Sequence, residues 1–111
     1  MSIVEIDPAA GHDLVGRGAV LLDVRELDEW TAGHAPEATW IALGELQARA
    51  AQVPADRTVV CICRSGARSL RAAEFLVARG HDARNLEGGM RAWAAAGLSV
   101  VTEAGEAGTV I

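Results

Sequence analysis

The chain has 111 residues, half of them hydrophobic and 23 % charged, which is typical of one globular domain and unlike disordered or collagen-like chains. Its net charge of −5 argues against a general binder of nucleic acid or membrane surfaces, because a basic excess supplies most of that affinity. No apolar stretch approaches the roughly 20 residues that span a bilayer, and residues 1–7 lack the features of a signal peptide. We therefore expect a cytoplasmic protein.

The first half of the chain is predicted to alternate strands with helices. Asp7-Pro8 has the residue types of a helix N-cap followed by the first helical position, and this helix is expected to end near Gly16. The continuous apolar run over 19–24 predicts a central strand buried on both faces. The other elements expected here are strands over 3–6 and 39–41 and helices over 26–31 and 43–50.

The second half continues the alternation. We expect strands over 58–62 and 83–86, each followed by a helix, the first ending at Gly80 and the second at Gly97. This pattern predicts an α/β fold, with a mostly parallel central sheet flanked by helices on both faces and a ligand site at the carboxyl ends of the strands. One domain over residues 1–101 is expected, with a mobile tail over 102–111 that is rich in Gly, Ala and Glu.

The loop at residues 63–69, which we call the cysteine loop, is the most informative segment. Its sequence is Cys63-Arg64-Ser65-Gly66-Ala67-Arg68-Ser69, and it joins an expected strand to the start of an expected helix. Such a turn directs several backbone N–H groups at one point, with the positive end of the helix dipole behind them. The loop therefore predicts an anion cradle that would also stabilise the nucleophilic thiolate of Cys63.

The second cysteine has a different expected role. Cys61 lies inside the apolar run, on the same face of the strand as Cys63 but deeper, and we expect it to be part of the core. A disulfide between the two is not expected, since they are too close along an extended strand and a reducing compartment keeps thiols free. No metal or cofactor is expected, because no second cysteine pair or histidine cluster completes a tetrahedral set.

At this point the sequence resembles the rhodanese family of sulfurtransferases. The cysteine loop is similar to the family's active-site loop, in which four residues separate cysteine from arginine. Residues 21–26 with Glu29-Trp30 and residues 33–36 resemble the family's first signature, and residues 86–90 with Trp93 resemble its second. The resemblance covers about residues 3–101 and implies a single rhodanese-like domain.

The resemblance implies a thiosulfate sulfurtransferase, in which Cys63 attacks the sulfane sulfur of a small anionic donor and holds it as a persulfide. A thiol or cyanide would accept the sulfur, as could a sulfur-carrier protein, and no cofactor is needed. Backbone N–H groups of the loop, including those near Gly66 and Ala67, and the guanidinium groups of Arg64 and Arg68 would bind the donor. Ser65 and Ser69 could donate hydroxyl hydrogen bonds to the anion, although Ser69 could equally cap the following helix.

Three charged residues are predicted to support the site. Asp23 and Arg25 follow a buried strand, where an ion pair that fixes neighbouring loops is favoured over a direct role in the reaction. Glu87, which precedes two glycines, has the same two alternatives.

Two other functions remain open on the sequence. A cysteine-dependent phosphatase or arsenate reductase also uses cysteine and arginine in an anion-binding loop, but it places five residues between them, whereas Cys63 and Arg68 enclose four. The other alternative is a rhodanese-like module that binds a protein partner or transmits a signal without turnover. The retention of Cys63 with both arginines favours catalysis.

Overall fold

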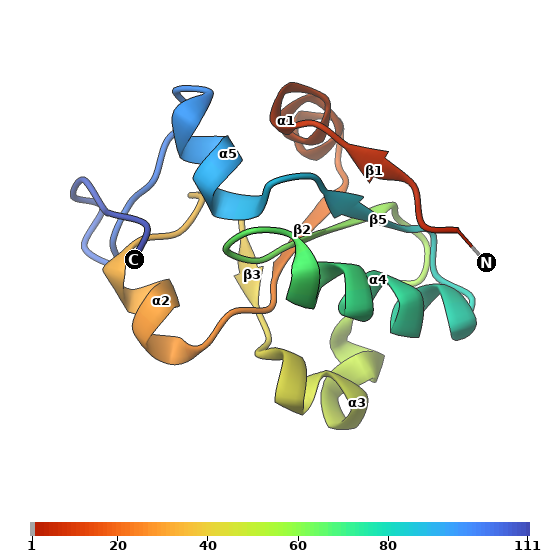
Figure 1. Cartoon of the computed structure of the whole chain (residues 1–111). Helices are drawn as coiled ribbons and strands as arrows, with labels where there is room; N and C mark the ends of the chain where they lie inside the picture. The colour runs from red at the N-terminus through yellow and green to blue at the C-terminus, as the bar shows by residue number, and fades with distance from the viewer. Residues whose placement is uncertain (1) are drawn as a thin grey trace.

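The computed structural model describes residues 2–111 and contains one five-stranded sheet in which all strands are parallel (Figure 1). The strand order is β1-β5-β4-β2-β3. The strands are β1 (Glu5–Ile6), β2 (Val20–Asp23), β3 (Thr39–Trp40), β4 (Val59–Ile62) and β5 (Ala83–Leu86). The α-helices are α1 (Pro8–Gly16), α2 (Leu27–Ala32), α3 (Leu46–Arg49), α4 (Ala67–Ala78) and α5 (Gly89–Ala95). The predicted α/β class is therefore confirmed.

The central strand of the sheet, β4, has the most apolar sequence. All four residues of β4 are buried, and β4 pairs with β2 on one side and β5 on the other. Strands of a parallel sheet are covered on both faces, so a continuous apolar run suits the centre. The two-residue strands β1 and β3 form the edges.

Two hydrophobic clusters pack against the two faces of the sheet. The first contains Leu22 and Cys61 from the sheet and Leu76 from α4. The second contains Leu21 and Trp93, with α1 and α5 on that face (Figure 1). Alternate residues of one strand thus serve opposite layers, which fixes the face to which each side chain of β4 points.

One predicted helix differs from what is observed. The segment 43–50 forms a 3₁₀ turn (Leu43–Glu45), the single turn α3 and a second 3₁₀ turn (Ala50–Gln52) instead of one continuous helix. Its start is tied to β2, because the Leu43 N–H donates to the Val24 carbonyl at 3.0 Å. Apolar spacing reports the buried side of such a segment but not its hydrogen-bond pattern.

The segment after α5 folds back towards α2. Val101 and His34 exchange backbone hydrogen bonds of 2.8 and 2.9 Å, and the Thr109 N–H donates to the Ala32 carbonyl at 2.9 Å. Arg64 donates through Nε to the Ile111 backbone oxygen at 2.9 Å. Whether residues 102–111 are mobile, as the sequence analysis expects, stays a prediction.

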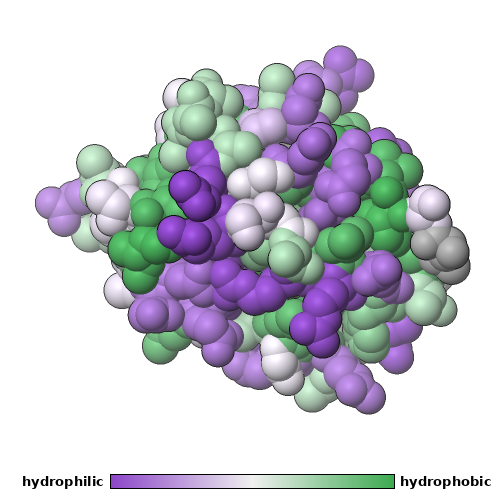
Figure 2. Space-filling model, viewed as in Figure 1, coloured by the Kyte–Doolittle hydropathy of each residue, from purple (hydrophilic) through white to green (hydrophobic). Residues whose placement is uncertain are grey.

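No helix within residues 2–111 combines the length and apolar character needed to cross a bilayer. The view shared by Figures 1 and 2 has hydrophilic side chains across its middle, over the loop that joins β4 to α4. Since that loop follows the carboxyl end of the central strand, this face carries the predicted ligand site.

Candidate active site

The cysteine loop forms a tight turn between β4 and α4. Cys63 directly follows β4, and Gly66 serves as the N-cap of α4 with φ of +107°, a backbone conformation that favours glycine. This turn directs the Gly66 N–H towards the Cys63 Sγ, at 3.1 Å. Ser69, in the first turn of α4, places its hydroxyl Oγ 3.2 Å from the same sulfur. The predicted cradle of donors around Cys63 is thus present in the structure.

Backbone N–H groups at the start of α5 donate hydrogen bonds to this loop. The Met90 N–H donates to the Cys63 carbonyl at 2.7 Å, and the Arg91 N–H donates to the Arg64 carbonyl at 3.1 Å. Gly89, with φ of +59°, lies so close that a Cβ atom there would be 2.6 Å from the Arg64 carbonyl carbon and oxygen. The glycine that follows β5 therefore permits backbone contact between two loops at the carboxyl end of the sheet.

The environment of Cys63 favours its thiolate. Burial raises the pKa of the Cys63 thiol, but hydrogen bonds from the Ser69 hydroxyl and from the N–H groups of Ser69, Gly66 and Ser65 outweigh burial and lower the pKa below its ordinary value. Cys63 is only 1 % exposed, so these donors replace bulk water as the sulfur's solvation. Burial without such donors raises the pKa of Cys61 to about 12, with the neighbouring Cys63 adding to the rise. Of the two thiols, Cys63 therefore has the lower pKa.

The lowered pKa of Cys63 should be visible in the pH dependence of its alkylation. Because only the thiolate reacts with iodoacetamide, the alkylation rate of Cys63 should rise with pH through its pKa and level off above it. With the pKa lowered, the midpoint should fall below the range of an unperturbed thiol, roughly pH 8.5. Intact mass after timed alkylation measures the rate, with Cys63→Ala as the control for labelling elsewhere. A midpoint at or above the ordinary value would contradict the geometry described.

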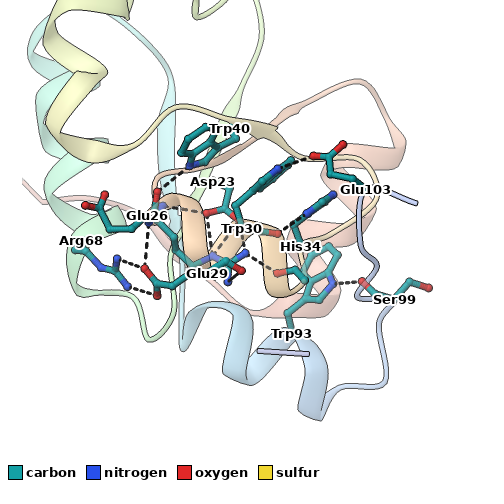
Figure 3. Close-up of polar contacts among 12 residues, drawn as sticks. Asp23, Glu26, Glu29, Trp30, His34, Trp40, Arg68, Trp93, Ser99 and Glu103 are labelled. Atoms are coloured by element: carbon teal, nitrogen blue, oxygen red, sulfur yellow. Dashed lines mark hydrogen bonds and ion pairs between the residues drawn. The ribbon is translucent and has the colours of Figure 1, made fainter. Parts of the chain in front are cut away.

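Arg68 is paired with an acidic residue of α2 (Figure 3). Its Nη1 and Nη2 atoms lie 2.6 and 2.8 Å from the two carboxylate oxygens of Glu29. This bidentate bond lowers the pKa of Glu29 against the opposing effect of burial, and it raises the pKa of Arg68. Much of the hydrogen-bonding capacity of Arg68 is therefore directed at Glu29, a residue that the sequence analysis did not propose for the site.

Asp23 and Arg25 form the predicted ion pair, with 2.8 Å between the Arg25 Nη2 and Asp23 Oδ2 and no solvent exposure of either side chain. Arg25 also donates to the carbonyl groups of Glu29 and Gly33 at 3.3 and 2.8 Å. The pair thus connects the end of β2 to the middle and the C-terminal end of α2, the helix that carries the partner of Arg68. A buried pair with this many hydrogen bonds holds neighbouring loops in place.

The remaining predicted residues are exposed. Arg64, Ser65 and Ala67 lie on the surface of the cysteine loop, and the Arg64 side chain reaches the last residue of the chain. Glu87 is also exposed, and its carboxylate makes no hydrogen bond or ion pair to other residues within 2–111. Its predicted supporting role stays a prediction. Ser69 is inside α4 rather than at its N-cap, which leaves its hydroxyl free to face the sulfur.

An aromatic group lies beside α2 (Figure 3). The rings of Trp30 and His34 stack at 3.6 Å with 5° between their planes, and the Trp30 Nε1 donates to Glu103 of the tail at 2.8 Å. Trp40 donates through Nε1 to the Arg25 carbonyl at 2.7 Å. These rings pack around the helix that bears Glu29.

One polar residue near Cys63 was missed by the sequence analysis. Asn85, in the buried strand β5, accepts a hydrogen bond from the Ser69 hydroxyl at 2.6 Å through Oδ1. The available signal was an asparagine next to Leu86 in a strand expected over residues 83–86, since a buried amide needs partners.

Comparisons with known proteins agree with this geometry. The rhodanese-like domain family matches residues 7–96 of this chain. A sulfurtransferase of Allochromatium vinosum is 39 % identical over 87 residues, covering 78 % of this chain and 81 % of the relative. The putative sulfurtransferase YtwF of Bacillus subtilis is 37 % identical over 95 residues, covering 84 % of this chain and 92 % of the relative. The crystal structure of a rhodanese-related protein from Thermoplasma volcanium has a TM-score of 0.84 and 31 % identity, covering 90 % of this chain and 99 % of that one. The chain therefore belongs to the rhodanese-like domain family.

Proposed function

We propose that this protein is a thiosulfate sulfurtransferase that carries the transferred sulfur as a persulfide on Cys63. The observation that carries the proposal is the set of donors around its sulfur: the Gly66 N–H at 3.1 Å and the Ser69 hydroxyl at 3.2 Å. Relatives named sulfurtransferases support a sulfur-transfer role for the family. Thiosulfate as donor and cyanide or a thiol as acceptor are the specific assignment proposed here.

The proposed reaction has two steps. The Cys63 thiolate attacks the outer sulfur of thiosulfate, a bond from Sγ to that sulfur forms, and the S–S bond of the donor breaks with its electron pair leaving on sulfite. The negative charge now rests on the outer sulfur of the persulfide. A nucleophilic acceptor such as cyanide then attacks this sulfur, giving thiocyanate and the Cys63 thiolate again. Backbone N–H groups fixed in the loop, such as that of Gly66, serve both anionic states.

A cysteine phosphatase is supported less well by the geometry of Arg68. In such a mechanism the arginine fork binds the phosphate oxygens, but both Nη atoms of Arg68 are bonded to Glu29. The shorter ring of four residues between Cys63 and Arg68 also disfavours a tetrahedral phosphate.

Turnover assays separate the candidate functions. The proposal predicts that thiosulfate and cyanide yield thiocyanate, whereas an aryl phosphate is not hydrolysed. Phosphate release that Cys63→Ser abolishes would replace the proposal with a phosphatase. Absence of product from thiosulfate and from an organic persulfide donor would replace it with a binding module.

Arg64 is predicted to recruit the donor. It is exposed on the cysteine loop and carries a positive charge that attracts a dianion from solution. Arg64→Ala should raise the KM for thiosulfate by roughly 3–10-fold and change kcat by less than about 2-fold, since it removes binding that is equal in the ground and transition states.

The matched control for this variant is Arg57→Ala. Arg57 is also exposed, but it precedes β4 and so lies at the opposite end of the sheet. The same loss of charge there should leave KM unchanged. Equal effects of the two variants would show that only net charge matters and would remove Arg64 from the donor site.

A further inference from the structure

A chain of polar side chains leads from Cys63 through buried Ser69 and Asn85 to exposed Glu5 at the edge of the sheet. The Ser69 Oγ lies 3.2 Å from the Cys63 Sγ and 2.6 Å from the Asn85 Oδ1. The Asn85 Nδ2 in turn donates to the Gly66 carbonyl at 3.0 Å and to the two carboxylate oxygens of Glu5 at 3.0 and 3.1 Å. Residues of α4, β5 and β1 thus form one connected network behind the nucleophile.

The orientation of the Asn85 amide is fixed by its partners. The Gly66 carbonyl and the Glu5 carboxylate can only accept hydrogen bonds, so the amide nitrogen must face them. The Asn85 oxygen therefore faces Ser69 and requires a donor, because Asn85 is only 2 % exposed. The only hydrogen available on the Ser69 side chain is that of its hydroxyl.

One hydroxyl hydrogen thus serves two acceptors. While Cys63 is a thiol, its S–H can donate to the Ser69 oxygen, and Ser69 can donate to Asn85, which satisfies all three groups. Once Cys63 ionises, the thiolate itself accepts, and the Ser69 hydroxyl must turn from Asn85 towards the sulfur to stabilise it. Each turn deprives the other acceptor of the Ser69 hydrogen, and the sulfur then keeps only backbone donors such as the Gly66 N–H at 3.1 Å.

We propose that Asn85 is a positioning residue that competes with the Cys63 sulfur for the single hydroxyl hydrogen of Ser69. Glu5 and the Gly66 carbonyl hold the asparagine in the competing orientation. The inference rests on the proposed function in one respect, namely that Cys63 is the nucleophile.

The competition has a consequence for the proposed reaction. In the thiolate the negative charge is on Sγ, which accepts a hydrogen bond from the Ser69 hydroxyl. In the persulfide the charge has moved to the outer sulfur. The Ser69 hydrogen can then return to Asn85, with no proton gained or lost by the protein. Asn85 thus makes the thiolate less stable relative to the persulfide, and so favours loading of sulfur.

Other charged groups around Cys63 define the controls. On β4, Cys61 stays neutral because its pKa is raised to about 12. On α4, Arg68 is paired with Glu29 of α2, and in the loop Arg64 bonds the Ile111 oxygen. On β1, Glu5 carries a negative charge next to Asn85. Glu5→Gln removes that charge and keeps an oxygen acceptor for Asn85, so it tests charge apart from hydrogen bonding.

The test is the pH dependence of Cys63 alkylation by iodoacetamide, measured by intact mass on the full chain. Asn85→Ala removes the competing acceptor, and the midpoint should fall by about 0.5–1 pH unit, which corresponds to a roughly 3–10-fold gain in the thiolate-to-thiol ratio. Asn85→Val, which suits a strand better, should give the same direction if the alanine variant folds poorly. Glu5→Gln should shift the midpoint by less than about 0.3 unit.

A double-mutant cycle shows whether Asn85 acts through Ser69. In a Ser69→Ala background the wild-type and Asn85→Ala midpoints should coincide, because no hydroxyl remains to be shared. An unchanged or higher midpoint in the single Asn85 variants, or a shift that persists without the hydroxyl, would overturn the inference. Alkylation does not depend on sulfur transfer, so failure of the proposed function would appear separately, as absence of thiocyanate formation by a protein whose titration behaves as described.

Discussion

Cys63→Ser is expected to lower sulfur transfer from thiosulfate to cyanide by roughly 10⁴-fold or more, while the protein stays folded. A serine hydroxyl at this position can still accept from the Gly66 N–H and the Ser69 hydroxyl, which lie 3.1 and 3.2 Å from the present sulfur. It does not ionise near neutral pH and forms no persulfide. Thiocyanate formation measures the activity. The free energy of unfolding, obtained from thermal melts, should change by less than about 1 kcal/mol.

The control for this variant is Cys61→Ser. Cys61 lies in the core, and its pKa is raised to about 12, so it is not a nucleophile near neutral pH. Its substitution buries a hydroxyl and should lower stability while leaving the activity of the folded fraction nearly unchanged. Loss of activity per folded molecule in Cys61→Ser, comparable with that of Cys63→Ser, would show that the wrong thiol has been assigned.

Gly89→Ala should produce the largest loss of stability from a single methyl group. The added Cβ would overlap the backbone of Cys63 and Arg64, and the residue has φ of +59°. Left-handed backbone costs a non-glycine residue roughly 1–2 kcal/mol, and overpacking adds roughly 1–3 kcal/mol. We therefore expect unfolding free energy to fall by about 2–5 kcal/mol and Tm to fall by more than about 10 °C.

Gly97→Ala supplies the matched control for this effect. Gly97 has a similar φ of +80°, but a Cβ there would meet no atom within 4 Å. Only the backbone cost should remain, roughly 1–2 kcal/mol. Similar Tm values for the two variants would contradict the close approach of α5 to the cysteine loop.

The sequence predicts the parts of this fold that depend on local pattern. Strand β4, the loop after it and helix α4 are all visible in the run of apolar residues, the glycine and the helical stripe that follow one another along the chain. The same local logic places Cys63 against the Gly66 N–H, because a strand end, a turn and a helix start fix that geometry. The contrast between Cys61 and Cys63 likewise follows from their positions along one strand.

Pairings between distant side chains could not be predicted in the same way. Arg68 lies 39 residues from Glu29, and Glu5 lies 80 residues from Asn85. Hydrophobic periodicity identifies the buried face of an element, but it contains no information on which polar groups meet across the sheet edge. The arginine expected to bind the donor thus proves to be bonded to Glu29, and the asparagine behind Ser69 was not recognised.

The most direct test of the proposed mechanism is the intact mass of the reduced protein after incubation with thiosulfate, before and after cyanide is added. Wild-type protein should gain one sulfur atom and lose it to cyanide with release of thiocyanate, whereas Cys63→Ser should gain none. A wild-type mass that does not change with thiosulfate or with an organic persulfide donor would contradict the assignment of Cys63 as a sulfur carrier.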